Sequence, residues 1–367
     1  MASGQRRPRT DSGGPRSRVV VQILNSRRVA TWFAPSSIMG RVPQTARPAL
    51  FLTSVFIAAI LAGTLLLLLP VATREGQSTS FMTALFTATS ALAVTGLVVV
   101  NTAQHWSFFG QGVILMLIQV GGLGVMTVYV AVATRLFRQR GSHVSFRQRM
   151  LLNENFAEPG LGGLVKMVSW LVRLTVVAEF SGAVLLTMAF ARYEPLGSAA
   201  WHGLFHAVSA FNNAGFDLFA DSLTQFVGDP LVNLVVVALI VFGGLGYLAL
   251  FNLFASRRLR EDRLRHRATP RRLQMLHVRL MLWGTVLMIA VSIGLILLLE
   301  WHNTDTLGPM SLGEKLLAAL FQAVTPRTAG FNTVDMIDLR TPTHLLLMLL
   351  MFVGAGSGST AGGVKIT

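Results

Sequence analysis

The sequence contains no cysteine and few charged residues. Cysteine is absent from all 367 residues, and Asp, Glu, Lys and Arg together make up 13% of them. Without cysteine the chain has neither a disulfide framework nor a thiolate metal site, and its eight histidines lack the spacing of metal ligands. Because 52% of the residues are hydrophobic, the composition does not fit a soluble globular domain.

Long charge-free runs dominate the sequence. Asp, Glu, Lys and Arg are all absent from residues 48–73, 76–134, 230–256, 280–299 and 341–364. About 20 apolar residues in a helix are enough to cross the hydrocarbon core of a bilayer. The predicted fold class is therefore an all-α polytopic membrane protein.

Basic residues form three islands between these hydrophobic runs. Nine Arg and a single Asp fall within residues 1–47, five Arg lie in 135–149, and eight lie in 257–272. Such islands are typical of cytoplasmic segments under the positive-inside rule, which explains the net charge of +15 better than a nucleic-acid-binding patch does. The apolar stretch "VVVQIL" is too short for a signal peptide. We therefore expect a cytoplasmic N-terminus and no nucleic-acid partner.

Two motifs recur three times in register. The first occurs as "FTATSALAVTGLVVVN" (86–101), "FHAVSAFNNAGFDLFA" (205–220) and "FQAVTPRTAGFNTVDM" (321–336). Its glycines, Gly96, Gly215 and Gly330, are 119 and 115 residues apart. The second motif, "GGLG" at 121–124 and 243–246 and "GAGS" at 354–357, begins 25, 28 and 24 residues after these glycines. Two motifs in register predict tandem repeats.

Each repeat is predicted to contain two spanning helices and a shorter helix between them. First spanning helices are expected at 49–69, 165–191 and 277–299, and second ones at 107–134, 230–256 and 342–353 onward. Segments 79–92, 199–211 and 313–324 are too short to cross and are interpreted as re-entrant half-helices. The domains are an extension (1–47), repeat 1 (48–136), a linker (137–160), repeat 2 (161–256), a basic linker (257–274) and repeat 3 (275–367). Because each repeat crosses twice, all share one orientation around a central axis.

The loops after the half-helices are candidate ion-filter segments. Non-helical backbone at membrane depth is tolerated where it lines an aqueous path, and inward carbonyl groups can replace the hydration shell of a cation. The filter segments are Val94, Thr95, Gly96 and Leu97; Asn213, Ala214, Gly215 and Phe216; and Thr328, Ala329, Gly330 and Phe331. Ten of the sixteen acidic residues fall on the side opposite the basic islands, where they would attract cations. The alternative is that these loops are ordinary turns with glycine as a helix C-cap.

Charged and amide side chains near the filter segments have predicted roles. Arg327 would repel a cation on the axis, so we expect it to support the filter from behind by donating to carbonyl groups or to Asp335. Asn332 and Asn213 are expected to brace their loops, with ion ligands at the pore mouth as the alternative role. Glu179 lies inside a spanning helix, where acids are functional candidates, although a structural bond to a neighbouring helix is favoured.

The quoted loops, together with "LIQVGGLGVMT" and "GAGSGSTAGGVK", resemble the Trk/Ktr/HKT superfamily of potassium transporters and are most similar to the Ktr-type membrane subunit. The resemblance covers about residues 48–367. It implies helix–pore–helix repeats around one K⁺ pathway in the plasma membrane, a homodimer, and a cytosolic ring of nucleotide-binding regulatory subunits (KtrA- or TrkA-like). It implies no cofactor in this chain and no metal besides transported K⁺. In such relatives a serine at the first filter glycine accompanies Na⁺ preference, so glycine at all three positions, Gly96, Gly215 and Gly330, favours K⁺.

The same resemblance implies that residues 354–365 form an intramembrane gate loop. Its members are Gly354, Gly356, Ser357, Gly358, Ser359, Thr360, Gly362, Gly363 and Lys365. Gly362 follows Gly330 by only 32 residues, which is too close for another filter. The alternative is a helix end with a cytoplasmic lysine. Because the family has four repeats, a fourth is expected beyond Thr367.

Three functions follow from this pattern. The first is K⁺ uptake through a gated, channel-like pore under a cytosolic regulatory subunit. The second is transport of Na⁺ or of mixed cations, and the third is a scaffold or inactive remnant. An enzyme is not expected, because no acid–base pair, nucleophile–base set or nucleotide loop is present.

Overall fold

The computed structural model describes residues 47–124, 161–246, 249–250, 253, 271–353, 356 and 359. The chain divides into two compact units, residues 1–49 and 50–367, and the description below concerns the second unit. Within the described residues the regular elements are helices, apart from isolated bridges such as the antiparallel one between Thr73 and Trp106.

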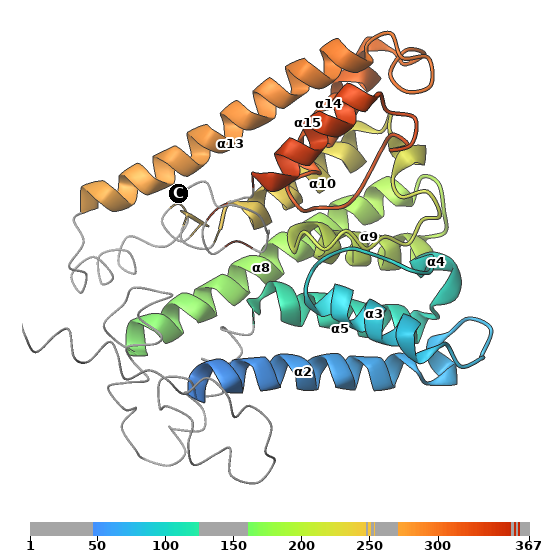
Figure 1. The fold of residues 1–367 in the computed structure, drawn as a ribbon, viewed down its shortest axis with the longest axis vertical. Helices are drawn as coiled ribbons and strands as arrows, with labels where there is room; N and C mark the ends of the chain where they lie inside the picture. Colours follow the sequence, from blue (N-terminus) through green and yellow to red (C-terminus); the bar gives the residue numbers. More distant parts are fainter. Residues whose placement is uncertain are drawn as a thin grey trace, which may run out of the picture. The chain divides into compact units, whose positions relative to one another are not determined.

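The helices follow one order in each repeat. Repeat 1 has α2 (Arg47–Leu67), η1 (Pro70–Ala72), α3 (Phe81–Leu92), α4 (Thr102–His105) and α5 (Phe108–Gly122); repeat 2 has α8 (Leu161–Phe190), α9 (Leu196–Phe211), η2 (Thr224–Phe226) and α10 (Pro230–Gly244); repeat 3 has α13 (Arg271–Glu300), α14 (Leu312–Val324) and α15 (Thr341–Phe352). Figure 1 shows the three long helices α2, α8 and α13, each with shorter helices of its own repeat beside it. The helix order predicted from the sequence is thus present three times.

Two described helices are long and apolar enough to cross a membrane by themselves. These stretches are Ser169–Phe190 within α8 and Val278–Glu300 within α13. Large apolar side chains cover their outward faces: Phe180 is 69% exposed and Leu298 is 75% exposed. Exposed apolar surface of this extent fits contact with lipid chains rather than with water.

The half-helices α3, α9 and α14, called pore helices below, are 12, 16 and 13 residues long. At 1.5 Å per residue they reach about 18–24 Å, less than the ~30 Å hydrocarbon core. The Ser80 side chain caps α3 by accepting from the Thr83 N–H, and Ser311 forms a capping box with Glu314 at the start of α14. Each pore helix therefore has its C-terminal end at a filter segment.

The second spanning helices are interrupted, which corrects the prediction of continuous helices over 107–134 and 230–256. Helix α5 ends at Gly122 and α10 ends at Gly244. Just beyond them, Gly124 and Gly246 have φ of +77° and +84°, in the left-handed region that a straight helix does not contain. Each "GGLG" motif therefore breaks its helix, and this feature is not confined to the third repeat.

Consecutive repeats are joined by the second helix of one and the pore helix of the next. Helix α5 packs on α9, and α10 packs on α14. At the first of these contacts the Trp201 indole donates to Gln111 Oε1 at 2.7 Å. One apolar cluster combines Ile114 and Ile118 with Phe205, while another combines Val236 and Ile240 with Phe321. The repeats therefore follow one another in space in their sequence order.

In repeats 2 and 3 a buried carboxylate joins the end of the first spanning helix to the start of the second. Glu300, at the end of α13, is fully buried. It accepts hydrogen bonds from Thr343 Oγ1, Asn303 Nδ2, Thr306 Oγ1 and the Arg340 N–H. In repeat 2, Asp229 caps α10 and forms an ion pair with Arg192 at 2.6 Å. These clusters connect the spanning helices on either side of α9 and α14.

Candidate functional site

The three filter segments share one unusual backbone pattern. In each, the glycine and the residue two positions before it have positive φ: Val94 (+55°) and Gly96 (+78°), Asn213 (+56°) and Gly215 (+70°), Thr328 (+66°) and Gly330 (+83°). Positive φ is costly for the β-branched Val94 and Thr328, and such strain is concentrated at functional sites. In an extended strand, successive carbonyl groups point in opposite directions. Left-handed residues at alternate positions break this alternation. This geometry suits carbonyl groups that face one path.

The filter glycines of neighbouring repeats lie against one another. A Cβ atom added to Gly96 would lie 2.5 Å from the Ala214 carbonyl oxygen and 3.3 Å from the Cα of Gly215. One added to Gly215 would lie 2.7 Å from the Ala329 carbonyl oxygen and 3.0 Å from the Cα of Gly330. Three segments that are more than 100 residues apart therefore converge at one place, as the repeat pattern predicts.

Each filter segment is held from behind by the last turn of its pore helix. The amides of Thr95, Ala214 and Ala329 donate to the carbonyl groups of Ser90, Ser209 and Thr325, at 2.9, 2.8 and 3.0 Å. The hydroxyl groups of two of these residues donate back to the end of the segment: Ser209 to the Phe216 carbonyl at 2.6 Å, and Thr325 to the Phe331 carbonyl.

Not all twelve predicted filter residues have the same role. Because the Phe216 and Phe331 carbonyl groups accept bonds from the protein and their side chains are buried, these two residues brace the loops. Leu97, the equivalent residue of repeat 1, is 60% exposed. The carbonyl groups of Ala214 and Ala329, which lie against the neighbouring glycines, are the better candidates for ion contact.

A cavity of about 340 Å³ is lined in part by the filter glycines; it is called the outer cavity below, after the side that the sequence predicts to face outward. Its lining consists of Gly96, Val98, Asn101, Thr102, Gly215, Asp217, Ala220, Asp221, Ser222, Thr224, Gly330, Asn332 and Asp335. Three carboxyl groups thus surround the point where the loops meet, and Arg and Lys are absent from this lining. Burial raises the pKa of the Asp217 carboxyl to about 6, although a hydrogen bond from Ser222 acts in the opposite direction. The outer cavity favours cations.

Hydrogen bonds between repeats hold the rim of this cavity. Asn101 Nδ2 donates to the Ala220 carbonyl at 3.1 Å, which joins the loops of repeats 1 and 2. The Leu223 N–H donates to the Asn332 carbonyl at 3.0 Å, which joins repeats 2 and 3. The Asn332 amide side chain also donates to the Val334 carbonyl at 3.2 Å, so this residue braces its loop.

Polar residues three positions before a filter glycine attach the loop to the first spanning helix of the same repeat. Arg327 is 6% exposed and donates from Nη2 to Thr285 Oγ1 of α13 at 3.3 Å. It lies behind the filter segment, but its partner is Thr285 and not Asp335, the acid expected from the sequence. In repeat 2, Asn212 donates to Glu179 of α8 at 2.9 Å. Asn212 was not among the residues predicted from the sequence, although its offset from Gly215 matches that of Arg327 from Gly330.

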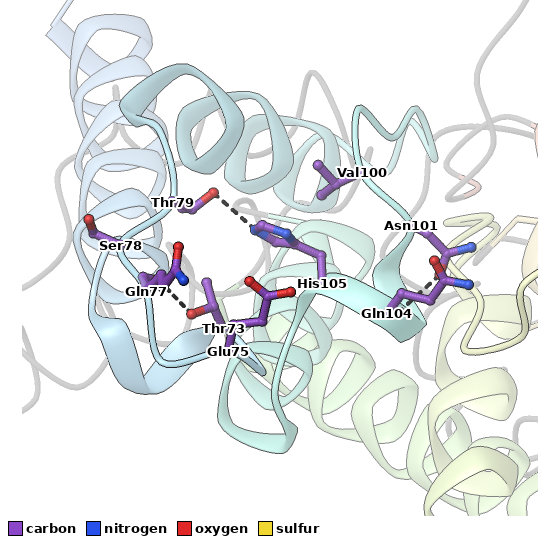
Figure 2. Close-up of a pocket in the computed structure, with 9 residues that line it drawn as sticks. All are labelled: Thr73, Glu75, Gln77, Ser78, Thr79, Val100, Asn101, Gln104 and His105. Carbon is purple, nitrogen blue, oxygen red and sulfur yellow. Dashed lines mark hydrogen bonds between the residues drawn. The ribbon is translucent and has the colours of Figure 1, made fainter.

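A second cavity, the side cavity, lies beside repeat 1 and does not include a filter glycine. Figure 2 shows its lining residues, Thr73, Glu75, Gln77, Ser78, Thr79, Val100, Asn101, Gln104 and His105. His105 Nε2 and Thr79 Oγ1 are 3.0 Å apart across it. Asn101 lines both cavities, because its Oδ1 caps α4 while its Nδ2 holds the Ala220 carbonyl.

Two residues of the predicted gate loop are described. The Gly356 N–H donates to the Gly244 carbonyl at 3.0 Å, and a Cβ added to Gly356 would lie 2.5 Å from the Leu245 carbonyl oxygen. The Ser359 N–H donates to the Gly356 carbonyl at 3.1 Å. This loop therefore contacts the interrupted end of α10. The other predicted members, Gly354, Ser357, Gly358, Thr360, Gly362, Gly363 and Lys365, lie outside the described residues.

Comparisons with known proteins find relatives of this chain. The chain is 42% identical over 312 residues to "Ktr system potassium uptake protein B" of Bacillus subtilis, with 85% of this chain and 66% of the relative covered. It is 39% identical to the protein of the same name from Vibrio alginolyticus, with coverage of 85% and 65%. It is 37% identical to "Potassium/sodium uptake protein NtpJ" of Enterococcus hirae, with coverage of 89% and 69%. The chain thus spans about two thirds of the length of these relatives.

A solved structure has the same fold. The potassium transporter TrkH from Vibrio parahaemolyticus superposes with a TM-score of 0.58 at 22% identity, over 89% of this chain and 60% of that one. A family model described as "TrkH: Cation transport protein" matches residues 32–367. The prediction of an all-α membrane protein is confirmed. The chain belongs to the TrkH family of cation transport proteins.

Proposed function

We propose that this chain builds a K⁺ uptake pathway across the plasma membrane, in which ions pass from the outer cavity between the filter segments. One observation carries the proposal. The glycines of three separate repeats, each with the same pair of left-handed residues, meet at the floor of a single cavity lined by acids. Ordinary connecting turns would not need to converge or to share this strained backbone.

Several features make a cation the better substrate than an anion. The C-terminal ends of α3, α9 and α14, which carry the negative end of the helix dipole, lie at the filter segments. Asp217, Asp221 and Asp335 line the entrance. The cationic side chain closest in sequence to a filter glycine, Arg327, is buried and bonded to Thr285 of α13. The field along this path attracts positive charge.

Within the cations, K⁺ is proposed as the substrate, with Na⁺ or mixed cations as the second candidate. Two of the relatives described above are named potassium uptake proteins, which supports K⁺. Glycine at all three filter positions leaves carbonyl oxygens as the groups closest to the path, as in K⁺-coordinating filters. A relative named as a potassium/sodium uptake protein keeps the second candidate open.

Control of the pathway is proposed to come from below the filter and from outside the chain. The loop that begins near Gly354 would close the path and move for K⁺ to pass, and the contact of Gly356 with the end of α10 supports its position there. We further propose a homodimer with a cytoplasmic N-terminus. A cytosolic nucleotide-binding ring would dock on the arginine-rich face, and nucleotide would bind to that ring and not to this chain.

The test is growth at limiting K⁺ of a bacterium that lacks its own K⁺ uptake systems. The chain is expressed from its complete reading frame as wild type, as Gly96→Ser and as Gly76→Ser. Gly76 is a matched control, since its φ of +68° imposes a similar backbone cost while no atom lies within 4 Å of an added Cβ. At Gly96 the added Cβ would meet the Ala214 carbonyl at 2.5 Å.

Rescue by wild type and by Gly76→Ser, with weaker rescue by Gly96→Ser, is the expected result. Uptake of Na⁺ and Rb⁺ is then measured in the same cells, and Gly96→Ser should shift the ratio toward Na⁺. If wild type reaches the membrane with its regulatory partner and does not restore growth, K⁺ uptake is rejected. Equal Na⁺ and Rb⁺ uptake by wild type would favour the mixed-cation alternative.

A further inference from the structure

A carboxylate lies inside the membrane-spanning helix α8, where it contacts two other helices. Glu179 is 6% exposed. Its Oε2 accepts from Gln119 Nε2 of α5 at 3.1 Å, and its Oε1 accepts from Asn212 Nδ2 at 2.9 Å. Asn212 Nδ2 also lies 3.2 Å from Gln119 Oε1. A carboxylate at this depth is costly, so a role that depends on these bonds explains its presence better than packing does.

The two partners of Glu179 lie next to functional backbone. Asn212 is the C-cap of pore helix α9 and is followed directly by Asn213, the first left-handed residue of the second filter segment. Gln119 lies on α5, one turn before the "GGLG" break. A Cβ added to Gly122 would lie 1.8 Å from Asn212 Oδ1, so the Asn212 side chain fits against this glycine. The three side chains therefore join the broken helix of repeat 1 to the filter of repeat 2.

The same position is attached in the third repeat with different chemistry. Arg327 stands three residues before Gly330, as Asn212 stands three before Gly215, and it bonds to Thr285 of its own first spanning helix. The corresponding residue of repeat 1 is Ala93, which has no polar side chain. Two repeats thus attach the loop at this position, one through an acid and an amide and the other through a guanidinium and a hydroxyl. This recurrence indicates that the loop must be held in place.

We propose that Glu179 is a positioning residue for ion selection, which holds Asn212 and thereby the second filter segment against α5. The inference rests on the proposed function, since it assigns this residue to the discrimination between K⁺ and Na⁺. A filter that selects by the placement of carbonyl groups loses selectivity when a segment is free to move. Glu179 touches no ion; it acts through Asn212 and Gln119.

The experiment compares three substitutions in α8 and α5 with one control. Glu179→Ala removes both bonds, whereas Glu179→Gln keeps an acceptor for Asn212. Gln119 can turn its amide to accept from the new one; it then gives up its 3.2 Å contact with Asn212 Nδ2, which keeps the Val208 carbonyl as a second acceptor. Gln119→Met is a milder change that removes one partner and keeps the length of the side chain. Ser181→Ala is the control, because this exposed hydroxyl bonds, among the described residues, to the Ala178 carbonyl of its own helix.

Two readouts are measured on the full-length protein. The first is the ratio of Rb⁺ to Na⁺ uptake in proteoliposomes. The second is amide hydrogen exchange over residues 209–216, which does not require transport. Glu179→Ala should lower the uptake ratio about tenfold and speed exchange of the Asn212, Asn213 and Ala214 amides about tenfold. Gln119→Met should change both in the same direction by less, while Glu179→Gln and Ser181→Ala should resemble wild type.

Each result either supports the positioning role of Glu179 or overturns it. Unchanged uptake ratio and exchange in Glu179→Ala, or in Gln119→Met if Glu179→Ala does not fold, would overturn the proposal. Glu179→Gln as impaired as Glu179→Ala would also overturn it, because the negative charge and not the bonding geometry would be responsible. If wild type takes up neither ion, the proposed function fails, and the exchange rates still decide whether Glu179 holds the filter segment.

Discussion

Gly121 lies where helix α5 meets the end of pore helix α3, and the contact leaves no room for a side chain. A Cβ added there would lie 2.0 Å from the Leu92 carbonyl oxygen and 2.9 Å from its carbonyl carbon. Leu92 is the last residue of α3, two positions before the first filter segment. Gly112, on the same helix, has no atom within 4 Å of an added Cβ. The pair Gly121→Ala and Gly112→Ala therefore separates steric effects from helix propensity.

The expected difference follows from these distances. A relaxed carbon–oxygen contact is about 3.3 Å or longer, so Gly121→Ala must move α5 and the end of α3 apart by more than about 1 Å. Overpacking of this kind costs about 1–3 kcal/mol, and the upper part of the range applies because both contacting groups are held by helical backbone. Alanine recovers about 1 kcal/mol of helix propensity at either site. We expect Gly121→Ala to destabilise by about 2 kcal/mol and Gly112→Ala to be neutral or slightly stabilising.

The assay is the temperature at which the purified, detergent-solubilised protein loses its monodisperse elution peak, measured together with the Rb⁺ to Na⁺ uptake ratio. Gly121→Ala should lower both, because the displaced carbonyl belongs to the turn that leads into Val94. Gly112→Ala should lower neither. Equal melting temperatures for the two variants, with normal selectivity in Gly121→Ala, would refute the reasoning that the "GGLG" glycine buttresses the filter.

Three further predictions address the outer cavity, the loop braces and the helix frame. Burial raises the pKa of the Asp217 carboxyl to about 6, so its negative charge is present above that pH and is lost below it. K⁺ uptake should therefore fall as the external pH drops through about 6. The Asp217→Asn variant should take up K⁺ more slowly and should not show this pH-dependent fall. Thr325→Val removes the hydroxyl that donates to the Phe331 carbonyl, and it should cost about 1 kcal/mol of stability and lower the Rb⁺ to Na⁺ uptake ratio. Ser209→Ala should have a similar effect in repeat 2. Glu300→Ala leaves several buried donors without an acceptor and should lower stability by about 3 kcal/mol or abolish expression. If this variant melts at the wild-type temperature, the cluster around Glu300 does not hold α13 to α15.

Local sequence patterns were sufficient to predict much of the helical architecture. The first spanning helices and the pore helices lie close to their predicted ranges, because uninterrupted apolar runs bounded by charge or by Ser and Pro caps leave few alternatives. The filter segments were recognisable because glycine recurs at one position in three repeats, and those glycines do have positive φ. The "GGLG" motifs were recognised as repeats, but their effect was missed, since the predicted second helices continued through Gly124 and Gly246.

The sequence by itself determined the class of the protein, its membrane spans, its threefold repetition and the position of each filter glycine, because these depend on composition and on residues near one another in the chain. Only the tertiary structure decided which groups meet: Gly96 with the Ala214 carbonyl, Arg327 with Thr285 and not Asp335, and Glu179 with Asn212 and Gln119. These partners are 33 to 118 residues apart, and no local propensity specifies such pairs. They arise because α9 and α14 each pack on the first spanning helix of their own repeat and on the second helix of the preceding repeat, which places distant polar groups where burial requires a partner.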